Sequence, residues 1–518
     1  MSARPSNAEP IIMTWLSYLA NAAFILIVLS LGVYVALEMR ILRISRKTER
    51  RRLTELTEGG AAQPAAQDTS LDATATAPPG GAKPRVSVLL PIHNEAAVVE
   101  RLIDAVCALR YPPEALEILV LDDSTDHTCA VARDRVERHE RRGVNIRLLR
   151  RRDRSGFKAG NLMHGLKSAT GAFFVIFDAD FVPPQDFLLR CMPCFDDPRL
   201  GYLQTAIGYE NSDASFLTRF QAMEMGHQQY LTAGLSEDGG MASLSGSSCI
   251  WRRTCVQALG GWNADTVTED VDLGYRAQFD DWKYAYLGDV VSMSILPEAI
   301  STFRIQRERW GRGLIHSAFL HARKMARQRM PMLKRLHAVS MMFSSVLLAS
   351  MYVLVLLGLP LNYLVNFDRI EVQVGAVTLF ALVTLWSLGS TLGARRRTRP
   401  ADRAGVAATL WYNYLYIAMF IPMAWYYFVG GIRAFLGVNG DFHRTPKGDV
   451  ERGVALPPIN RTLMVGEAFT FGYALVALVQ AVRDGNYILL PLDVTACVGF
   501  GMVLYWSWQE ARLRQRGQ

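Results

Sequence analysis

Six long apolar runs constrain the fold of this chain more than any other feature of its sequence. Each is close to the roughly 20 residues that a helix needs to cross a bilayer. The runs are Ile11–Leu37, His337–Val365, Val372–Ala394, Gly405–Ile432, Leu463–Val482 and Tyr487–Trp508. Of the 518 residues 50% are hydrophobic, and the excess is concentrated in these runs. The sequence therefore predicts a polytopic membrane protein.

The distribution of basic residues predicts an orientation. Arginines between Arg40 and Arg52 follow the first run, so the positive-inside rule places that end in the cytoplasm and the amino terminus outside. If Gly405–Ile432 crossed the membrane, the basic loop and basic tail after it would lie outside, against the rule. We expect five spans and a cytoplasmic carboxyl terminus, with Gly405–Ile432 lying along the interface or re-entering. Hydropathy alone favours the alternative of six crossings.

These runs also predict the domain organisation. Residues 1–39 are expected to form an anchor, and residues 40–83 a linker that is first basic and then flexible, being rich in Ala, Gly, Pro and Thr. Residues 84–330 are expected to form a soluble cytoplasmic domain. Residues 331–518 would return to transmembrane and interfacial helices.

The soluble region begins with alternating strands and helices. The sequence predicts buried strands at Val86–Ile92, Glu117–Leu121 and Ala172–Phe177, and a helix is indicated by the spacing in Ala96–Leu109. This order predicts a parallel sheet with right-handed crossovers, whose carboxyl strand ends form the ligand crevice. Two acidic pairs, Asp122-Asp123 and Asp178-Ala179-Asp180, fall at such ends.

Three motifs suggest transfer of a sugar from a nucleotide donor. Asp178 and Asp180 offer hard oxygen ligands for Mg²⁺ or Mn²⁺, which would neutralise a leaving diphosphate. In Thr268-Glu269-Asp270, Asp270 could act as general base on an acceptor hydroxyl with Glu269 beside it, although such a triplet alone is more often a helix cap.

A third motif lies just before the second apolar run. Gln306, Arg309 and Trp310 combine a planar fork for phosphate oxygens with an aromatic face for a sugar ring. Helical spacing would put Gln306 and Trp310 on one face. The alternative is an amphipathic helix on acidic lipids, and the two interpretations are compatible.

Other charged residues leave alternatives open. Arginines in the run Arg150–Arg154 either form a solvated face or attract donor phosphates. Glu467 and Asp493, inside predicted spans, either line a polar pathway or are paired within the bundle. The net charge of +8 is explained by cytoplasmic loops beside anionic lipid, and nucleic-acid binding has no further support.

The ordered motifs resemble those of a known family. Leu121-Asp122-Asp123-Ser124-Thr125-Asp126, Gly156-Phe157-Lys158-Ala159-Gly160, Phe177-Asp178-Ala179-Asp180-Phe181 and Thr268-Glu269-Asp270 are similar to motifs of the membrane-embedded inverting glycosyltransferases of family 2. That family includes cellulose, mannan, curdlan and hyaluronan synthases. The resemblance spans residues 84–448, is closest to the cellulose synthase-like type, and implies a GT-A type α/β domain inserted between transmembrane helices.

The resemblance also implies a role for each matching residue. Glu95, Asp122 and Asp123 would hold the nucleoside, and Lys158 would hold a phosphate. Asp178 and Asp180 would bind the Mg²⁺ or Mn²⁺, and Gln306 and Arg309 would contact the diphosphate. Asp270 with Glu269 would be catalytic. Trp310 and Gly246 would contact the acceptor, Gly246 within a segment that departs from the family's Phe-rich acceptor motif. Phe442, Thr445 and Lys447 would belong to a gating loop at residues 440–450.

The expected activity is the repeated transfer of a hexose to a β-linked glycan at the cytoplasmic face, followed by passage of the glycan through the membrane. UDP-glucose is the favoured donor, with GDP-mannose as the alternative. A ceramide glucosyltransferase-like enzyme that adds one sugar to a membrane lipid is the second candidate, and a catalytically silent scaffold is disfavoured. The expected location is a bacterial inner or plasma membrane.

Overall fold

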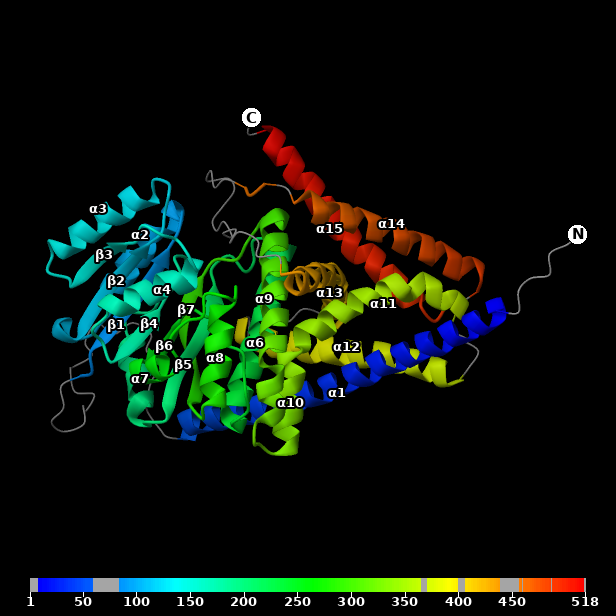
Figure 1. Cartoon of the computed structure of the whole chain (residues 1–518), viewed down its shortest axis with the longest axis horizontal. Helices are drawn as coiled ribbons and strands as arrows, with labels where there is room; N and C mark the ends of the chain where they lie inside the picture. The colour runs from blue at the N-terminus through cyan, green and yellow to red at the C-terminus, as the bar shows by residue number, and fades with distance from the viewer. Residues whose placement is uncertain are drawn as a thin grey trace, which may run out of the picture.

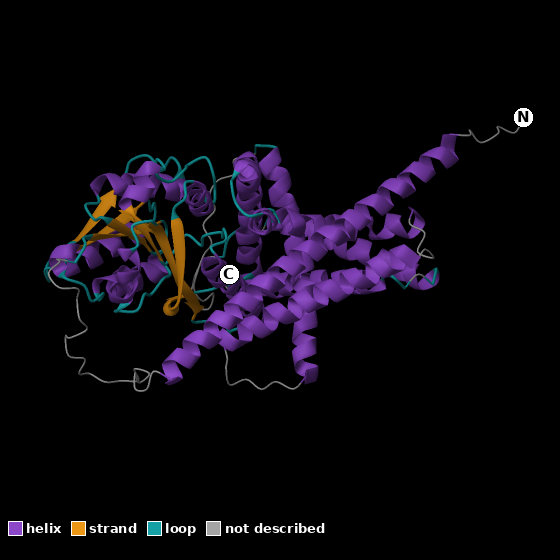
Figure 2. Ribbon diagram, turned by 90° about the horizontal axis from the view of Figure 1, so that it is seen from below, coloured by secondary structure: helices purple, strands orange, loops and turns teal. Residues whose placement is uncertain are grey.

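The computed structural model describes residues 8–58, 83–364, 370–398, 406–437, 456–458, 460–485 and 487–516. An α/β domain lies at one end of the molecule and the long helices extend from it (Figure 1). The amino-terminal end of α1 lies at the far end from the sheet (Figure 2). The predicted gating-loop residues Phe442, Thr445 and Lys447 lie outside the described residues.

The α/β domain is built on a seven-stranded sheet in the order β3-β2-β1-β4-β6-β5-β7. Its strands are β1 Val86–Ile92, β2 Leu116–Asp122, β3 Ile146–Arg150, β4 Phe173–Ile176, β5 Leu200–Tyr209, β6 Cys249–Arg252 and β7 Lys283–Ser294. Strands β1 to β4 are parallel, as predicted. The sheet is nevertheless mixed, because β6 lies antiparallel between β4 and β5.

Different helices cover the two faces of the sheet, because successive strand residues point to opposite faces. In β1, Val88 and Leu90 pack with α2 and α3, whereas Leu89 packs with α4. All residues of β1 are buried, which explains why the strand does not alternate and is apolar apart from Ser87, whose hydroxyl donates to the Glu117 carboxylate. The helices of this domain are α2 Ala96–Cys107, α3 Thr128–Glu140, α4 Phe157–Ser168, α5 Phe187–Cys191, α6 Phe216–Asp238, α7 Arg253–Ala258, α8 Glu269–Phe279 and α9 Ile300–Arg327, with short 3₁₀ turns at Pro113–Ala115 and Met192–Asp196.

The remaining helices are long and largely apolar. They are α1 Ala8–Glu58, α10 Met332–Met342, α11 Ser344–Leu364, α12 Ile370–Thr398, α13 Val406–Phe435, α14 Arg461–Arg483 and α15 Leu490–Arg516. Helix α1 continues well past the expected anchor boundary at residue 39, because residues 40–58 contain no Gly or Pro to end it and Arg40 pairs with Asp238 of α6 at 2.7 Å.

Within the described residues, four helices are long and apolar enough to cross a membrane, or five if α10 and α11, bent by 57°, form one span. The four are α1, α13, α14 and α15, whereas the apolar part of α12, Gln373–Gly389, is shorter. Helix α13 is seen nearly end-on in Figure 1, where α1, α11, α14 and α15 extend across the picture. It therefore runs across the other apolar helices rather than alongside them.

Helix α9 joins the α/β domain to the membrane helices through a buried ion pair. The Arg304 guanidinium donates to both carboxylate oxygens of Glu467 in α14, at 2.5 Å, and also to Ser507 of α15. Tyr426 of α13 donates its hydroxyl to Glu467 Oε1 at 2.7 Å. Of the two alternatives for Glu467, pairing within the bundle is therefore the one observed.

Replacing Glu467 with Gln should strongly destabilise the protein. The change leaves the Arg304 charge buried without its partner, which typically costs about 3–5 kcal/mol. The midpoint of thermal unfolding in detergent should fall clearly. Asp484→Asn, at an exposed helix end, is the control and should melt like the wild type; equal midpoints for both variants would contradict a structural role for the pair.

Candidate active site

The predicted donor acids lie at one edge of the sheet. Asp122 ends β2, and Asp178 follows β4 by two residues, so both lie at carboxyl ends of parallel strands. The turn after β1 contacts the same edge, since Asn94 Oδ1 accepts from the Thr125 amide at 2.8 Å and His93 Nδ1 lies 2.9 Å from the Asp123 carbonyl oxygen. Motifs that are separate in the sequence therefore lie together along one crevice of the fold.

Arginines of the basic run hold the two acids that were predicted to bind the nucleoside. Arg151 donates to both oxygens of Asp123 at 2.7 and 2.8 Å, and Arg150 Nε lies 3.2 Å from Asp122 Oδ2. Neither interpretation of this run anticipated the pairing. Glu95 lies in the adjacent turn, where its carboxylate accepts from the His93 amide at 3.3 Å.

Lys158 is surrounded by acidic groups at the start of α4. Its ammonium lies 2.6 Å from Asp178 Oδ1 and 3.6 Å from Glu269 Oε1, and it donates to the Gly246 carbonyl at 3.3 Å. Although burial acts against its charge, Asp178, Glu269 and Asp270 hold the pKa of Lys158 above its ordinary value. Three motifs that are far apart in the sequence thus meet at one ammonium group.

The predicted base lies in the first turn of α8. Burial raises the pKa of Asp270, and burial together with the nearby Asp270 charge raises that of Glu269 to about 7, while Lys158 lowers both. A carboxylate whose pKa approaches neutrality is a better proton acceptor than an exposed one. The raised pKa of Asp270 agrees in direction with a general base, and that role stays a prediction.

Gly246 allows Asp270 to occupy this position. Its φ is +71°, which favours glycine, and a Cβ added there would lie 2.0 Å from Asp270 Oδ2. Thus the predicted acceptor residue Gly246 contacts the base directly. Sequence reasoning placed it near the acceptor but did not reveal this steric requirement.

Helix α9 carries the third motif beside the base. Gln306 and Trp310 line the same cavity as Asp178 and Asp270, which confirms their expected common face. Burial lowers the pKa of Arg309, although Glu269, Asp178 and Asp270 oppose this effect.

Arg307 holds this motif in place, a role that the sequence analysis did not predict for it. Its guanidinium lies 4.5 Å from the centre of the Trp310 ring and 2.6 Å from Glu224 of α6. Both members of the ion pair are buried.

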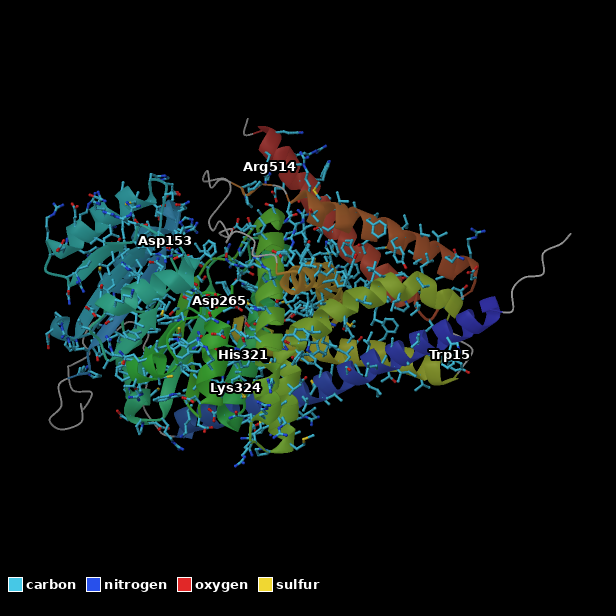
Figure 3. All side chains as sticks on the ribbon, in the orientation of Figure 1. Trp15, Asp153, Asp265, His321, Lys324 and Arg514 are labelled. Carbon is cyan, nitrogen blue, oxygen red and sulfur yellow. The ribbon has the colours of Figure 1, made fainter. Side chains whose placement is uncertain are left out.

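Helix α9 also fixes the loop that precedes the base. A Cβ at Gly313 would lie 2.3 Å from Thr268, and the Thr268 hydroxyl lies 3.1 Å from that of Ser317. One turn further along, His321 Nε2 lies 2.9 Å from Asp272 Oδ1 in α8 (Figure 3). The helix with the predicted diphosphate ligands and the helix with the base are therefore packed as one unit.

The two predicted metal ligands have different surroundings. The Asp178 side chain is 33% exposed and lines the cavity. Asp180 is 1% exposed, and its Oδ2 accepts from the hydroxyl of Ser294 and from the amide of Ile295 at 3.4 Å. Among the described residues, no group of three or more His, Cys, Asp or Glu side chains is arranged to hold a metal. Only Asp178 is therefore accessible from the cavity, and the metal-binding roles of Asp178 and Asp180 both stay predictions.

The cavity, of about 410 Å³, extends from Asp178 and Asp270 to the membrane helices. Its lining also includes Glu38 of α1, His227 of α6 and Trp386 of α12. His227 Nε2 lies 3.1 Å from Glu38 Oε2, which also accepts from the Trp386 indole. Neither Glu467 nor Asp493 belongs to its lining, so this cavity gives no support to the polar pathway that the sequence suggested for these two acids.

Fold and site together define a GT-A type glycosyltransferase domain: a mixed α/β sheet with acids at its carboxyl edge and the half-buried Asp270, the predicted base, lining the same cavity as Asp178. Residues 84–313 match the family model described as "Glycosyltransferase like family 2". The predicted resemblance to family-2 glycosyltransferases is therefore confirmed for this part of the chain.

Relatives of this domain include plant enzymes. The chain is 38% identical over 236 residues to glucomannan 4-beta-mannosyltransferase 2 of Arabidopsis thaliana, covering 44% of each chain. It is 37% identical over 239 residues to probable glucomannan 4-beta-mannosyltransferase 6 of Oryza sativa subsp. japonica, covering 44% of this chain and 41% of the rice protein. It is 34% identical to glucomannan 4-beta-mannosyltransferase 1 of Cyamopsis tetragonoloba over 274 residues, 50% of this chain and 51% of that protein. The matches thus span about half the length of these relatives or less.

Solved structures are more distant. A mannosyltransferase from Pyrobaculum calidifontis, in complex with GDP-Man and Mn²⁺, aligns with a TM-score of 0.47 at 19% identity, covering 79% of this chain and 100% of that chain.

Gly246→Ala should abolish most catalysis while leaving nucleotide binding intact. The added methyl group displaces the Asp270 carboxylate, and a misplacement of this size costs about 100-fold in rate. Gly260→Ala is the matched control, because Gly260 has a similar φ of +75° and no atom within 4 Å of an added Cβ. Comparable kcat values for the two variants would show that backbone strain, and not contact with Asp270, causes any loss.

The pH profile of sugar transfer should reflect the buried acids. The base acts in its ionised form, so a raised pKa means that activity rises with pH and is lost as the pH falls through that value. We expect the acidic limb of kcat/KM to lie above the ordinary aspartate pKa, with Glu269, whose pKa is about 7, contributing to it. A profile that is flat from pH 5 to 8 would contradict this assignment.

Proposed function

We propose that this chain is an inverting, processive β-mannosyltransferase that extends a β-linked glycan from GDP-mannose. One observation carries the proposal: Asp270, a half-buried carboxylate among the predicted donor-site residues, lines a cavity that continues into the membrane helices. The names of the relatives favour mannose, so GDP-mannose replaces UDP-glucose as the expected donor. Because these relatives are plant proteins, a bacterial inner membrane has no support from them.

The donor would bind along the carboxyl edge of the sheet. The nucleoside would lie against Glu95 and the ion-paired Asp122 and Asp123. Its diphosphate would be contacted by Lys158 and by Gln306 and Arg309 of α9, on the side of the crevice opposite the sheet. Cationic and amide donors in a partly desolvated site stabilise phosphate oxygens as negative charge develops on them.

A divalent ion fits this arrangement at Asp178. Mg²⁺ and Mn²⁺ are commonly held by one or two carboxylates together with substrate phosphates, which matches a single accessible carboxylate at the crevice. When bound, such an ion neutralises charge on the departing diphosphate. The hydrogen bonds of Asp180 to Ser294 and Ile295 would support the strand end that presents Asp178.

The acceptor would lie between Trp310 and Asp270. A sugar ring stacked on Trp310 would place a hydroxyl beside Asp270, which takes the proton as the oxygen attacks the anomeric carbon. Attack from the face opposite the diphosphate forms the new glycosidic bond, breaks the bond to phosphate and inverts the configuration. The proton ends on Asp270 and the electron pair on the departing diphosphate.

The cavity would hold the glycan that leaves this site. Its lining among the membrane helices includes the Trp386 ring, Glu38 and His227, and aromatic and hydrogen-bonding groups together suit a sugar chain. In the proposed orientation, the catalytic domain and the carboxyl terminus are in the cytoplasm and the amino terminus is outside. Helix α13 would lie along the membrane interface. Arg514 near the carboxyl terminus lies toward the catalytic domain, whereas Trp15 lies far from it on α1 (Figure 3).

A donor assay tests the proposal directly. Purified protein in lipid vesicles is incubated with Mg²⁺ or Mn²⁺ and radiolabelled GDP-mannose, UDP-glucose or GDP-glucose. We expect a polymer sensitive to β-mannanase from GDP-mannose alone. Incorporation only from UDP-glucose would overturn the donor assignment, and a lipid-extractable product would identify single addition to a membrane lipid instead.

Asp270→Asn should reduce transfer by about 100-fold or more, since general-base catalysis contributes that much. GDP binding should stay near the wild-type value, because the amide has the same shape and the donor contacts lie elsewhere. Asp265→Asn, in the loop before α8, is the control and should retain activity. Undiminished turnover by Asp270→Asn would refute its role as base.

A further inference from the structure

Lys158 occupies the position at which a divalent ion would meet the accessible carboxylate. Its ammonium lies 2.6 Å from Asp178 Oδ1, which is closer than the 3.6 Å to Glu269 Oε1. Its carbonyl contact with Gly246 at 3.3 Å fixes it from the other side. An ammonium this close to the carboxylate disfavours a divalent ion at the same group, because the two cations would lie a few ångströms apart and repel each other.

We infer that Lys158 is a counter-cation that keeps divalent metal out of the site until a nucleotide diphosphate arrives. The inference rests on the proposed function and adds an order of binding to it. It makes Lys158 a switch between two anionic partners, the Asp178 carboxylate and the donor phosphate.

The surroundings of Asp178 explain why metal alone binds weakly. Asp180 Oδ2 is already used by Ser294 and Ile295, and the described residues contain no ready cluster of three acidic, His or Cys ligands. A divalent ion would find one carboxylate and would have to displace an ammonium from it. The displaced Lys158 would then lie beside the ion, and like charges a few ångströms apart in a partly buried site repel each other strongly.

A diphosphate changes this balance. It supplies oxygen ligands to the ion and, at the same time, a new anionic partner for Lys158. Lysine is suited to the exchange, because its compact ammonium on a flexible stem moves between partners without a fixed fork geometry. Release of the nucleotide returns Lys158 to Asp178, so the ion is expected to leave with the nucleoside diphosphate.

Electron paramagnetic resonance of Mn²⁺ tests the order of binding. The full chain in detergent is titrated with Mn²⁺, with and without saturating GDP, and free Mn²⁺ is read from its solution signal. We expect binding at least about tenfold tighter with GDP than without it, after correction for the GDP–Mn²⁺ complex measured without protein. Equal affinities in the two titrations of the wild type would overturn the inference, and this comparison needs no variant.

Variants isolate the lysine. Lys158→Gln should bind Mn²⁺ without GDP about tenfold more tightly than the wild type, whereas Lys158→Arg, which keeps the charge, should not. Lys167→Gln, at the exposed end of the same helix, is the matched control and should behave as the wild type. If Lys158→Gln shows no gain in Mn²⁺ affinity while the wild type still polymerises mannose, only this inference fails; if no nucleotide sugar is used at all, the proposed function fails.

Discussion

Burial of charge governs how this molecule is assembled, because a desolvated ion is tolerated only where an opposite charge meets it. Helix α9 shows the constraint most clearly. Its Arg304 pairs with Glu467 of α14, and its Arg307 pairs with Glu224 of α6. A third contact joins its Glu308 to Arg433 of α13 at 3.1 Å. The helix with the predicted diphosphate ligands is thereby tied to the α/β domain and to the membrane helices at once.

The same constraint shapes the donor crevice. Asp123 is matched by Arg151, and Asp178 by Lys158, so the edge of the sheet is electrostatically compensated before any nucleotide binds. A sugar nucleotide therefore enters a site in which it must exchange partners with existing groups. This makes donor binding, metal binding and side-chain movement parts of one equilibrium.

The sequence predicts the elements whose signals are local. Strand β1 has the predicted bounds Val86–Ile92, because a strand buried on both faces is largely apolar, here with Ser87 as the exception. Strand β6, Cys249–Arg252, was missed because four residues contain no usable period and its antiparallel pairing depends on distant strands. Helix α1 ran beyond its expected end for a similar reason, since its last turns are polar but still helix-forming.

Some parts of the candidate site could likewise be predicted from the sequence, and other parts could not. Its acids and the residues of α9 form recognisable motifs, so they could be named before their geometry was known. Two ion pairs, Arg151 with Asp123 and Glu224 with Arg307, could not be predicted in this way, since each joins residues far apart in the chain. The donor sugar could not be chosen from the motifs, since UDP-glucose and GDP-mannose both carry a nucleoside diphosphate and the motifs recognise mainly that shared part; the names of the relatives favour GDP-mannose.

The guanidinium over Trp310 has a consequence for the direction of growth. Arg307 covers one face of the indole, and the ring lines the cavity. A platform covered on one side receives a sugar from the other side only, so every catalytic cycle would begin with the chain approaching from the cavity. The polarity of the product would then follow from a steric asymmetry at one aromatic ring, and no separate element would be needed to keep the chain from turning round.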